Sequence, residues 1–157
     1  MKGLHQTGCG NCLTAGKKRK ILVVDDDRHI LRCLSDLFSF FGYVVTIAHS
    51  GEDALSRLSK SQFDLVITDL IMPGMDGWTL ARHIKQASPI TPVILLTGEK
   101  GVRTTGRAEE DFVDLVLFKP IGIKVIREAL QKLTDRLTKD SPTEAVVGST
   151  TCLHNEQ

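Results

Sequence analysis

Short apolar runs recur between Lys20 and Lys119, and segments with helical spacing separate them. The five runs are "KILVVD", "YVVTIA", "FDLVITD", "PVILLT" and "DLVLFK", which begin at Lys20, Tyr43, Phe63, Pro92 and Asp114. Runs of this length, in which apolar and polar residues do not alternate, are typical of strands buried on both faces. The pattern therefore predicts five strands of a covered sheet.

The segments around these runs show the three- and four-residue spacing of amphipathic helices. Gly42 fits the end of the first helix, and Ser50 fits the N-cap of the second, with Asp53 at its third position. We expect Cys33, in the first helix, to be a small buried residue. The apolar positions are Ile30, Leu31, Leu34, Leu37, Phe38 and Phe41; Ala54, Leu55 and Leu58; Trp78, Ala81 and Ile84; and Ile123, Ile126, Leu130, Leu133 and Leu137. Strands that alternate with helices predict an α/β fold with a parallel sheet covered on both faces.

One stretch between the fourth and fifth strands departs from this pattern. The segment "KGVRTTGRAEED" contains two glycines and two threonines, which are poor helix formers, and few apolar residues. We expect a short, mobile or distorted segment over residues 99–111. Residues 1–19 and 138–157 show no hydrophobic period, which predicts a flexible arm and a flexible tail around one folded domain of residues 20–137.

The composition is that of an ordinary globular domain. The chain has 157 residues, of which 41% are hydrophobic and 25% charged, and its net charge is +1. A charge so close to zero argues against direct binding to nucleic acid. No apolar run approaches the roughly 20 residues of a membrane span, and the N-terminus lacks the apolar core of a signal peptide. These features predict a cytoplasmic protein that does not bind a membrane.

Chemically reactive side chains collect where the predicted strands end. Asp25–Asp27 follow the first strand, Asp69 ends the third, Thr97 ends the fourth and Lys119 ends the fifth. Ligands bind at this edge of parallel sheets. Clustered carboxylates repel one another unless a cation compensates, and oxygen ligands of this kind suit Mg²⁺. A lysine and a hydroxyl beside the metal suit a phosphoryl group, and one carboxylate can act as the nucleophile.

Four motifs carry a family resemblance. "ILVVDDD", "DLVITDLIMPGMDG", "PVILLTG" and "FKP" occur in the order and with the spacing of the receiver domain of two-component response regulators. The chain resembles this family over about residues 20–137. The resemblance implies a doubly wound, flavodoxin-like (CheY-like) fold with a five-stranded parallel sheet of order 2-1-3-4-5 and helices on both faces.

The resemblance also implies a role for each residue at the strand ends. Asp69 corresponds to the phosphoacceptor, and Asp26 and Asp69 correspond to direct Mg²⁺ ligands. Asp25 would act on the metal mainly through water, and the backbone carbonyl of Ile71 would be a third protein ligand. In the same way, Thr97 and Lys119 correspond to the hydroxyl and the ammonium that bind the phosphoryl group.

The function implied is that of a stand-alone receiver. It would accept a phosphoryl group from a sensor histidine kinase or a histidine phosphotransfer protein and would change its binding to a downstream protein target. Its own chemistry would be limited to self-catalysed phosphotransfer and autodephosphorylation, so it would not be a classical enzyme. We expect a monomer or a weak dimer. A fragment of a longer regulator or of a hybrid kinase would show the same motifs.

Several alternatives stay open. The chain could be a scaffold that keeps the receiver shape without being phosphorylated. Asp25 and Asp27 after an apolar run also resemble the first motif of haloacid-dehalogenase-like phosphatases, although later motifs are missing. Asp27 fits a helix cap better than a metal ligand. Cys9 and Cys12 form a single CxxC that could bind zinc, act as a redox pair, or remain free thiols.

Overall fold

The computed structural model describes residues 18–98 and 110–139 of the chain. The contacts between residues divide the chain into two compact units, Met1–Lys119 and Pro120–Gln157. The described part of the first unit contains the whole sheet and three α-helices, and the described part of the second contains one helix. None of the helices described is long and apolar enough to cross a membrane.

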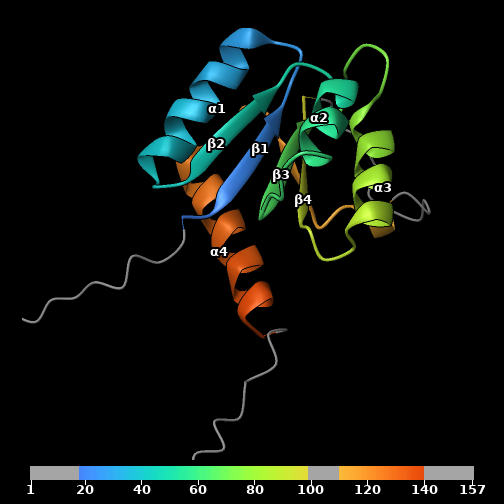
Figure 1. The fold of residues 1–157 in the computed structure, drawn as a ribbon. Coiled ribbons are helices and arrows are strands. Elements are labelled where there is room, and N and C mark those ends of the chain that lie inside the picture. Colours follow the sequence, from blue (N-terminus) through green and yellow to red (C-terminus); the bar gives the residue numbers. More distant parts are fainter. Residues whose placement is uncertain (1–17, 99–109, 140–157) are drawn as a thin grey trace, which may run out of the picture. The chain divides into compact units, whose positions relative to one another are not determined.

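Five parallel strands form one sheet in the first unit, in the order β2-β1-β3-β4-β5 (Figure 1). The strand order and all five predicted strands are confirmed. Because every pair is parallel, the carboxyl ends of the strands meet at one edge of the sheet. The strands are β1 (Lys20–Val24), β2 (Val44–Ala48), β3 (Leu65–Asp69), β4 (Val93–Thr97) and β5 (Leu115–Phe118).

Three helices cover the two faces of this sheet, which gives the doubly wound, flavodoxin-like architecture. Helix α1 (Arg28–Phe40) packs on β1 and β2, whereas α2 (Gly51–Leu58) and α3 (Gly77–Ala87) contact each other on the opposite face (Figure 1). A short 3₁₀ helix, η1 (Glu110–Phe112), precedes β5 and contacts α3.

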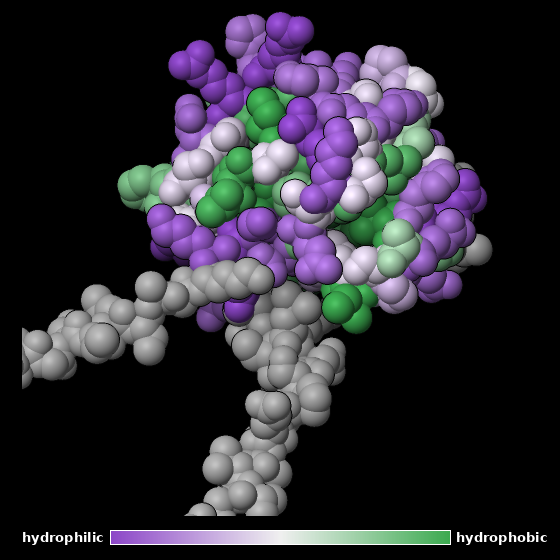
Figure 2. Space-filling model, in the orientation of Figure 1, coloured by the Kyte–Doolittle hydropathy of each residue, from purple (hydrophilic) through white to green (hydrophobic). Residues whose placement is uncertain are grey.

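The main core lies between the sheet and the pair α2 and α3. Strands β3 and β4 are buried along their whole length, as are the last four residues of β1, because they lie inside the sheet. In Figure 2 the apolar side chains reach the visible face only as separate patches among polar ones. The core cluster consists of Leu22, Val24, Ala48, Ala54, Phe63, Val66, Met72, Leu80, Ala81, Ile84 and Val93.

The predicted helix ends on either side of β2 are confirmed. Gly42 follows α1 with a φ of 88°, a left-handed conformation that suits glycine, and its N–H donates to the carbonyl of Ser39 at 2.9 Å. At the start of α2, the Ser50 hydroxyl accepts a hydrogen bond from the N–H of Asp53 at 3.2 Å. Both caps satisfy backbone groups that a helix end leaves without partners.

The prediction for Cys33 is wrong, because this residue is exposed. The buried side of α1 is formed by Leu31, Leu34 and Phe38. Cys33 lies two residues after Leu31, about 200° around the helix, and therefore points to solvent. Phe41, expected to continue the apolar stripe, is the C-cap residue after the helix.

The second unit contains helix α4 (Ile123–Lys139), the last helix that the sequence predicts. Ile126, Ala129, Leu130 and Leu133 are buried and lie on one side of this helix. Ile123 was expected on the same side, but it is 58% exposed. The predictions for residues 1–17, 99–109 and 140–157, including Cys9 and Cys12, fall outside the residues that the structure describes.

Candidate functional site

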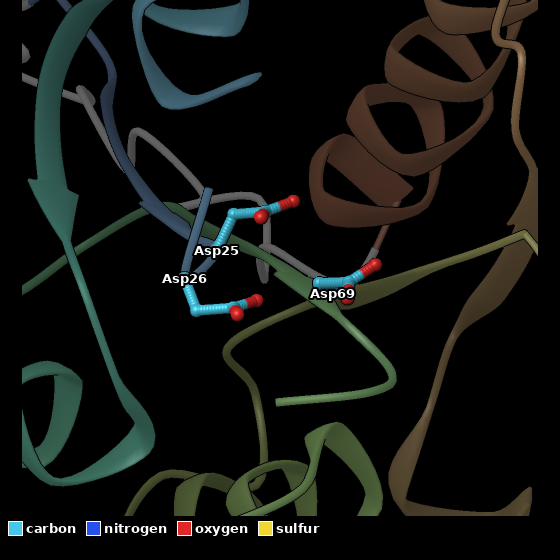
Figure 3. Close-up of side chains that lie close together, drawn as sticks. All are labelled: Asp25, Asp26 and Asp69. Carbon is cyan, nitrogen blue, oxygen red and sulfur yellow. The ribbon is translucent and has the colours of Figure 1, made fainter. Parts of the chain in front are cut away.

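Three carboxylates meet at the carboxyl edge of the sheet. Asp25 and Asp26 directly follow β1, and Asp69 is the last residue of the neighbouring strand β3. One carboxylate oxygen from each residue lies within 4.8 Å of the others. Figure 3 shows Asp25 and Asp26 extending from the end of β1 toward the side where Asp69 lies. The structure therefore brings together the three acids that the sequence analysis selected.

Lys119 reaches this cluster from the end of β5. Its ammonium group lies 2.7 Å from Oδ1 of Asp69 and 2.9 Å from Oδ2 of Asp25. Its backbone N–H donates to the carbonyl of Thr97 at 2.6 Å, which ties the end of β5 to the end of β4. The lysine therefore links the acids of two strands that are not its neighbours in the sheet.

Burial and ion pairing shift the pKa values of Asp25 and Lys119. Asp25 is only 1% exposed, and this burial raises the pKa of its carboxyl group. The Lys119 ammonium and the N–H of Asp27 oppose that effect. Burial would lower the pKa of Lys119, but the carboxylates of Asp69 and Asp25 outweigh burial and raise it. Lys119 therefore carries its positive charge at neutral pH.

Acidic groups outnumber basic ones in the cluster. Among the described residues, three carboxyl groups and one ammonium group meet at this rim. Asp25 and Asp69 are buried, whereas Asp26 is exposed and gives solvent access to the cluster. Hard oxygen donors with surplus negative charge are what Mg²⁺ binds in proteins. The donor set therefore fits a divalent cation of this kind.

Asp27 belongs to helix α1 and not to the cluster. Its carboxylate accepts a hydrogen bond from the N–H of His29 at 2.7 Å, and it is the N-cap residue. Its own N–H donates to Oδ1 of Asp25 at 2.9 Å. The interpretation of Asp27 as a helix cap is confirmed, and the cap also helps to orient Asp25.

Thr97 and Ile71, the two remaining residues predicted for the site, both lie between Asp69 and Lys119 in the chain. Thr97 ends β4, between the ends of β3 and β5, and it is 1% exposed. Ile71 lies two residues after Asp69, in the loop toward α3, and its side chain is 57% exposed. The roles of the Thr97 hydroxyl and the Ile71 carbonyl stay predictions.

Backbone hydrogen bonds hold both ends of the loop after Asp69. The N–H of Leu70 donates to the carbonyl of Leu96 at 2.8 Å, and the N–H of Gly77 donates to the carbonyl of Leu70 at 2.9 Å. Gly77 has no room for a side chain, because a Cβ atom there would lie 2.4 Å from the carbonyl oxygen of Asp69. The start of α3 therefore packs directly on the backbone at the end of β3.

Two features of this region were not predicted from the sequence. The first is the ion pair between Lys119 and Asp25, since only a phosphoryl role had been considered for the lysine. The second is Glu52 in α2, whose carboxylate lies beside Gly74 in the loop after Asp69. Neither feature has a periodic or motif signal, because both depend on how separate elements approach each other.

The comparisons agree with this geometry. The family model for the response regulator receiver domain matches residues 21–131. The sensor histidine kinase RcsC of Escherichia coli K12 is 38% identical over 119 residues, which is 76% of this chain but 12% of RcsC. The chain thus spans a small part of that relative.

Solved structures show the same fold. A response regulator receiver domain protein from Clostridium thermocellum has a TM-score of 0.71 and 30% identity, and the match covers 77% of this chain and 98% of that one. The response regulator TrrA of Thermotoga maritima, in complex with Mg²⁺ and BeF, has a TM-score of 0.68 and 31% identity, covering 73% and 98%.

Proposed function

Since the chain belongs to the response regulator receiver family, we propose that Asp69 is its phosphoacceptor and that phosphorylation there controls binding to a downstream protein. Receiver domains of response regulators are signalling domains that interact with histidine kinases or phosphotransfer proteins. The single observation that carries the proposal is the convergence of Asp25, Asp26, Asp69 and Lys119 at one rim. The proposed domain covers residues 20–137.

The proposed reaction is an in-line transfer. A carboxylate oxygen of Asp69 attacks the phosphorus atom of a phosphohistidine, and an O–P bond forms as the N–P bond breaks. The electron pair of the N–P bond returns to the imidazole of the donor, and the product is an acyl phosphate. Asp69 is suited to this role because it is the last residue of β3, only 9% exposed and held by a neighbouring ammonium group.

The other residues act on the charge of the transferred group. Lys119 would move from its contact with the Asp69 carboxylate to the phosphoryl oxygens, and the Thr97 hydroxyl would donate to one of them. Asp26, Asp69 and the carbonyl of Ile71 would hold Mg²⁺, with Asp25 acting mainly through water. When bound, Mg²⁺ supplies positive charge that offsets the acids and the phosphoryl oxygens.

Movements of Thr97 and Lys119 would couple phosphorylation to the surface of the protein. Lys119 follows β5 and Thr97 ends β4, and a backbone hydrogen bond already joins them. Recruiting both side chains to one phosphoryl group would favour one of two arrangements of the surface near these strands. The same proposal holds whether this receiver acts by itself or within a longer protein.

The test is intact-mass spectrometry after incubation with Mg²⁺ and acetyl phosphate. We expect the wild type to gain one phosphoryl group and Asp69→Asn, which keeps the size of the side chain, to gain none. Asp36→Asn is the matched control, because Asp36 is an exposed acid on α1, away from the cluster. It should be phosphorylated like the wild type.

Two results would contradict the proposal. Phosphorylation of Asp69→Asn would show that another residue is the nucleophile. A folded wild type that gains no phosphoryl group, either from acetyl phosphate or from a panel of histidine phosphotransfer proteins, would favour the phosphorylation-independent scaffold.

A further inference from the structure

The first turn of α2 contacts the loop that follows Asp69. A Cβ atom on Gly51 would lie 2.7 Å from Cβ of Met75 and 2.8 Å from its Sδ atom. The side chain of Met75 therefore lies directly on the backbone of Gly51, where only a glycine leaves room. Gly51 is buried by this contact, and Met75 also packs against the main core.

The next residue of α2 makes a polar contact with the same loop. The carboxylate of Glu52 lies beside the backbone of Gly74, which has a φ of 78°. A Cβ atom added to Gly74 would lie 3.2 Å from Oε1 of Glu52. The pKa of Glu52 is lowered by hydrogen bonds from its own backbone N–H, from the Ser50 hydroxyl and from the N–H of Met75. Two consecutive residues of α2 thus contact two consecutive residues of the loop.

The helix turn that makes these contacts is itself held firmly. Ser50 caps the N–H of Asp53 at 3.2 Å, and the Asp53 carboxylate accepts a hydrogen bond from the N–H of His49 at 3.1 Å. Arg57 donates to the same carboxylate at 3.0 Å. The first turn of α2 is therefore well supported at the point where the loop after Asp69 contacts it.

We propose that Glu52 is a positioning residue for the phosphoacceptor site. Its carboxylate, together with the contact of Met75 on Gly51, would hold the loop so that the carbonyl of Ile71 faces the acidic cluster. Glu52 itself touches neither the metal nor the phosphoryl group. This inference rests on the proposed function, in which Ile71 supplies a Mg²⁺ ligand, and it predicts that loosening the loop weakens Mg²⁺ binding.

Two conservative variants separate positioning from charge. Glu52→Gln removes the charge but keeps a carbonyl oxygen at the same reach, whereas Glu52→Asp keeps the charge and shortens the side chain by one methylene group. Both acidic residues suit the first turn of a helix, so Glu52→Asp should not weaken α2 itself. Glu52→Ala removes both properties. Gly51→Ala displaces the loop independently, through Met75.

The measurements are the dissociation constant for Mg²⁺ by titration calorimetry and amide hydrogen exchange over residues 70–77. We expect Glu52→Asp and Glu52→Ala to bind Mg²⁺ about two- to fivefold more weakly and to exchange faster in this loop. Gly51→Ala should behave in the same direction. Glu52→Gln should stay within about twofold of the wild type, because it keeps the acceptor.

The other outcomes overturn the inference. If Glu52→Gln binds Mg²⁺ as weakly as Glu52→Ala while Glu52→Asp matches the wild type, Glu52 acts through its charge and not by positioning. If all variants bind Mg²⁺ and exchange like the wild type, Glu52 has no role here, although the proposed function stands. A wild type that neither binds Mg²⁺ nor is phosphorylated overturns the proposed function and this inference with it.

Discussion

Replacing Gly77 with alanine adds one methyl group where α3 begins, against the backbone at the end of β3. The new Cβ atom would lie 2.4 Å from the carbonyl oxygen of Asp69 and 2.6 Å from Cδ2 of Leu95. Leu95 can change its rotamer, but the carbonyl oxygen belongs to a strand paired on both sides. To restore ordinary contact, the strand end and the helix must separate by about 1 Å.

The loss of stability from this separation is larger than the gain from the higher helix propensity of alanine. Overpacking of this kind lowers the free energy of unfolding by about 1–3 kcal/mol. Alanine in a helix interior gains up to about 1 kcal/mol over glycine, and less at the first position. We expect a net destabilisation of about 2 kcal/mol. A displacement of about 1 Å in a reacting group can slow a reaction by roughly a hundredfold. We therefore expect phosphorylation of Asp69 to slow by roughly tenfold or more.

The assay combines equilibrium unfolding in urea with the rate of phosphorylation by acetyl phosphate, measured where the variant is fully folded. Gly98→Ala is the first control, because a Cβ atom there meets nothing within 4 Å. Its free energy of unfolding should match that of the wild type within about 0.5 kcal/mol.

Gly42→Ala is the second control and separates strain from crowding. Gly42 has a φ of 88° and open space around it, so alanine should cost about 1–2 kcal/mol of stability and leave the phosphorylation rate unchanged. If Gly77→Ala unfolds at the wild-type midpoint and is phosphorylated at the wild-type rate, the close packing of α3 on Asp69 is not what holds the site.

Three further predictions follow from the charges of the molecule. Saturating Mg²⁺, at about a hundredfold excess over its Kd, should stabilise the fold by about 2–3 kcal/mol in calorimetry, and the effect should be reversed by a chelator and lost in Asp26→Asn. Lys119→Gln should slow phosphorylation by acetyl phosphate by roughly 10²-fold, whereas Lys85→Gln, which breaks the separate ion pair with Asp114, should not. Burial would raise the pKa of Asp53, but hydrogen bonds from Arg57 and a backbone N–H lower it below its ordinary value of 3.8. The ionised carboxylate therefore adds stability above pH 3.8 that is lost as the pH falls through the lowered pKa, so acid titrations followed by circular dichroism should show a flatter profile for Asp53→Asn.

The strands and their chemistry could be predicted because each signal is local. A continuous apolar run indicates a strand buried on both faces, and all five runs form strands of the sheet. Parallel strands bring their carboxyl ends to one edge, so Asp25, Asp69 and Lys119 could be expected to meet there. The order of the strands came from the family resemblance and not from these local signals.

Features that depend on how a helix is rotated against the sheet, or on how closely two elements pack, could not be predicted in this way. Cys33 lies in an apolar stretch, but the rotation of α1 against the sheet exposes it. Asp25 and Asp26 are adjacent acids whose carboxylates join the same cluster, yet Asp25 is buried and Asp26 is exposed.

The alternation of strands and helices can be read from the amino-acid sequence, as can the acids, the hydroxyl and the lysine that end the strands. The contacts of Lys119 with both Asp25 and Asp69, and the position of Glu52 beside Gly74, follow from the folded chain alone. The residues of these contacts lie far apart in the sequence. Local patterns report which side of an element is apolar, whereas contacts between distant side chains depend on how the packed elements are spaced and rotated, to within about an ångström.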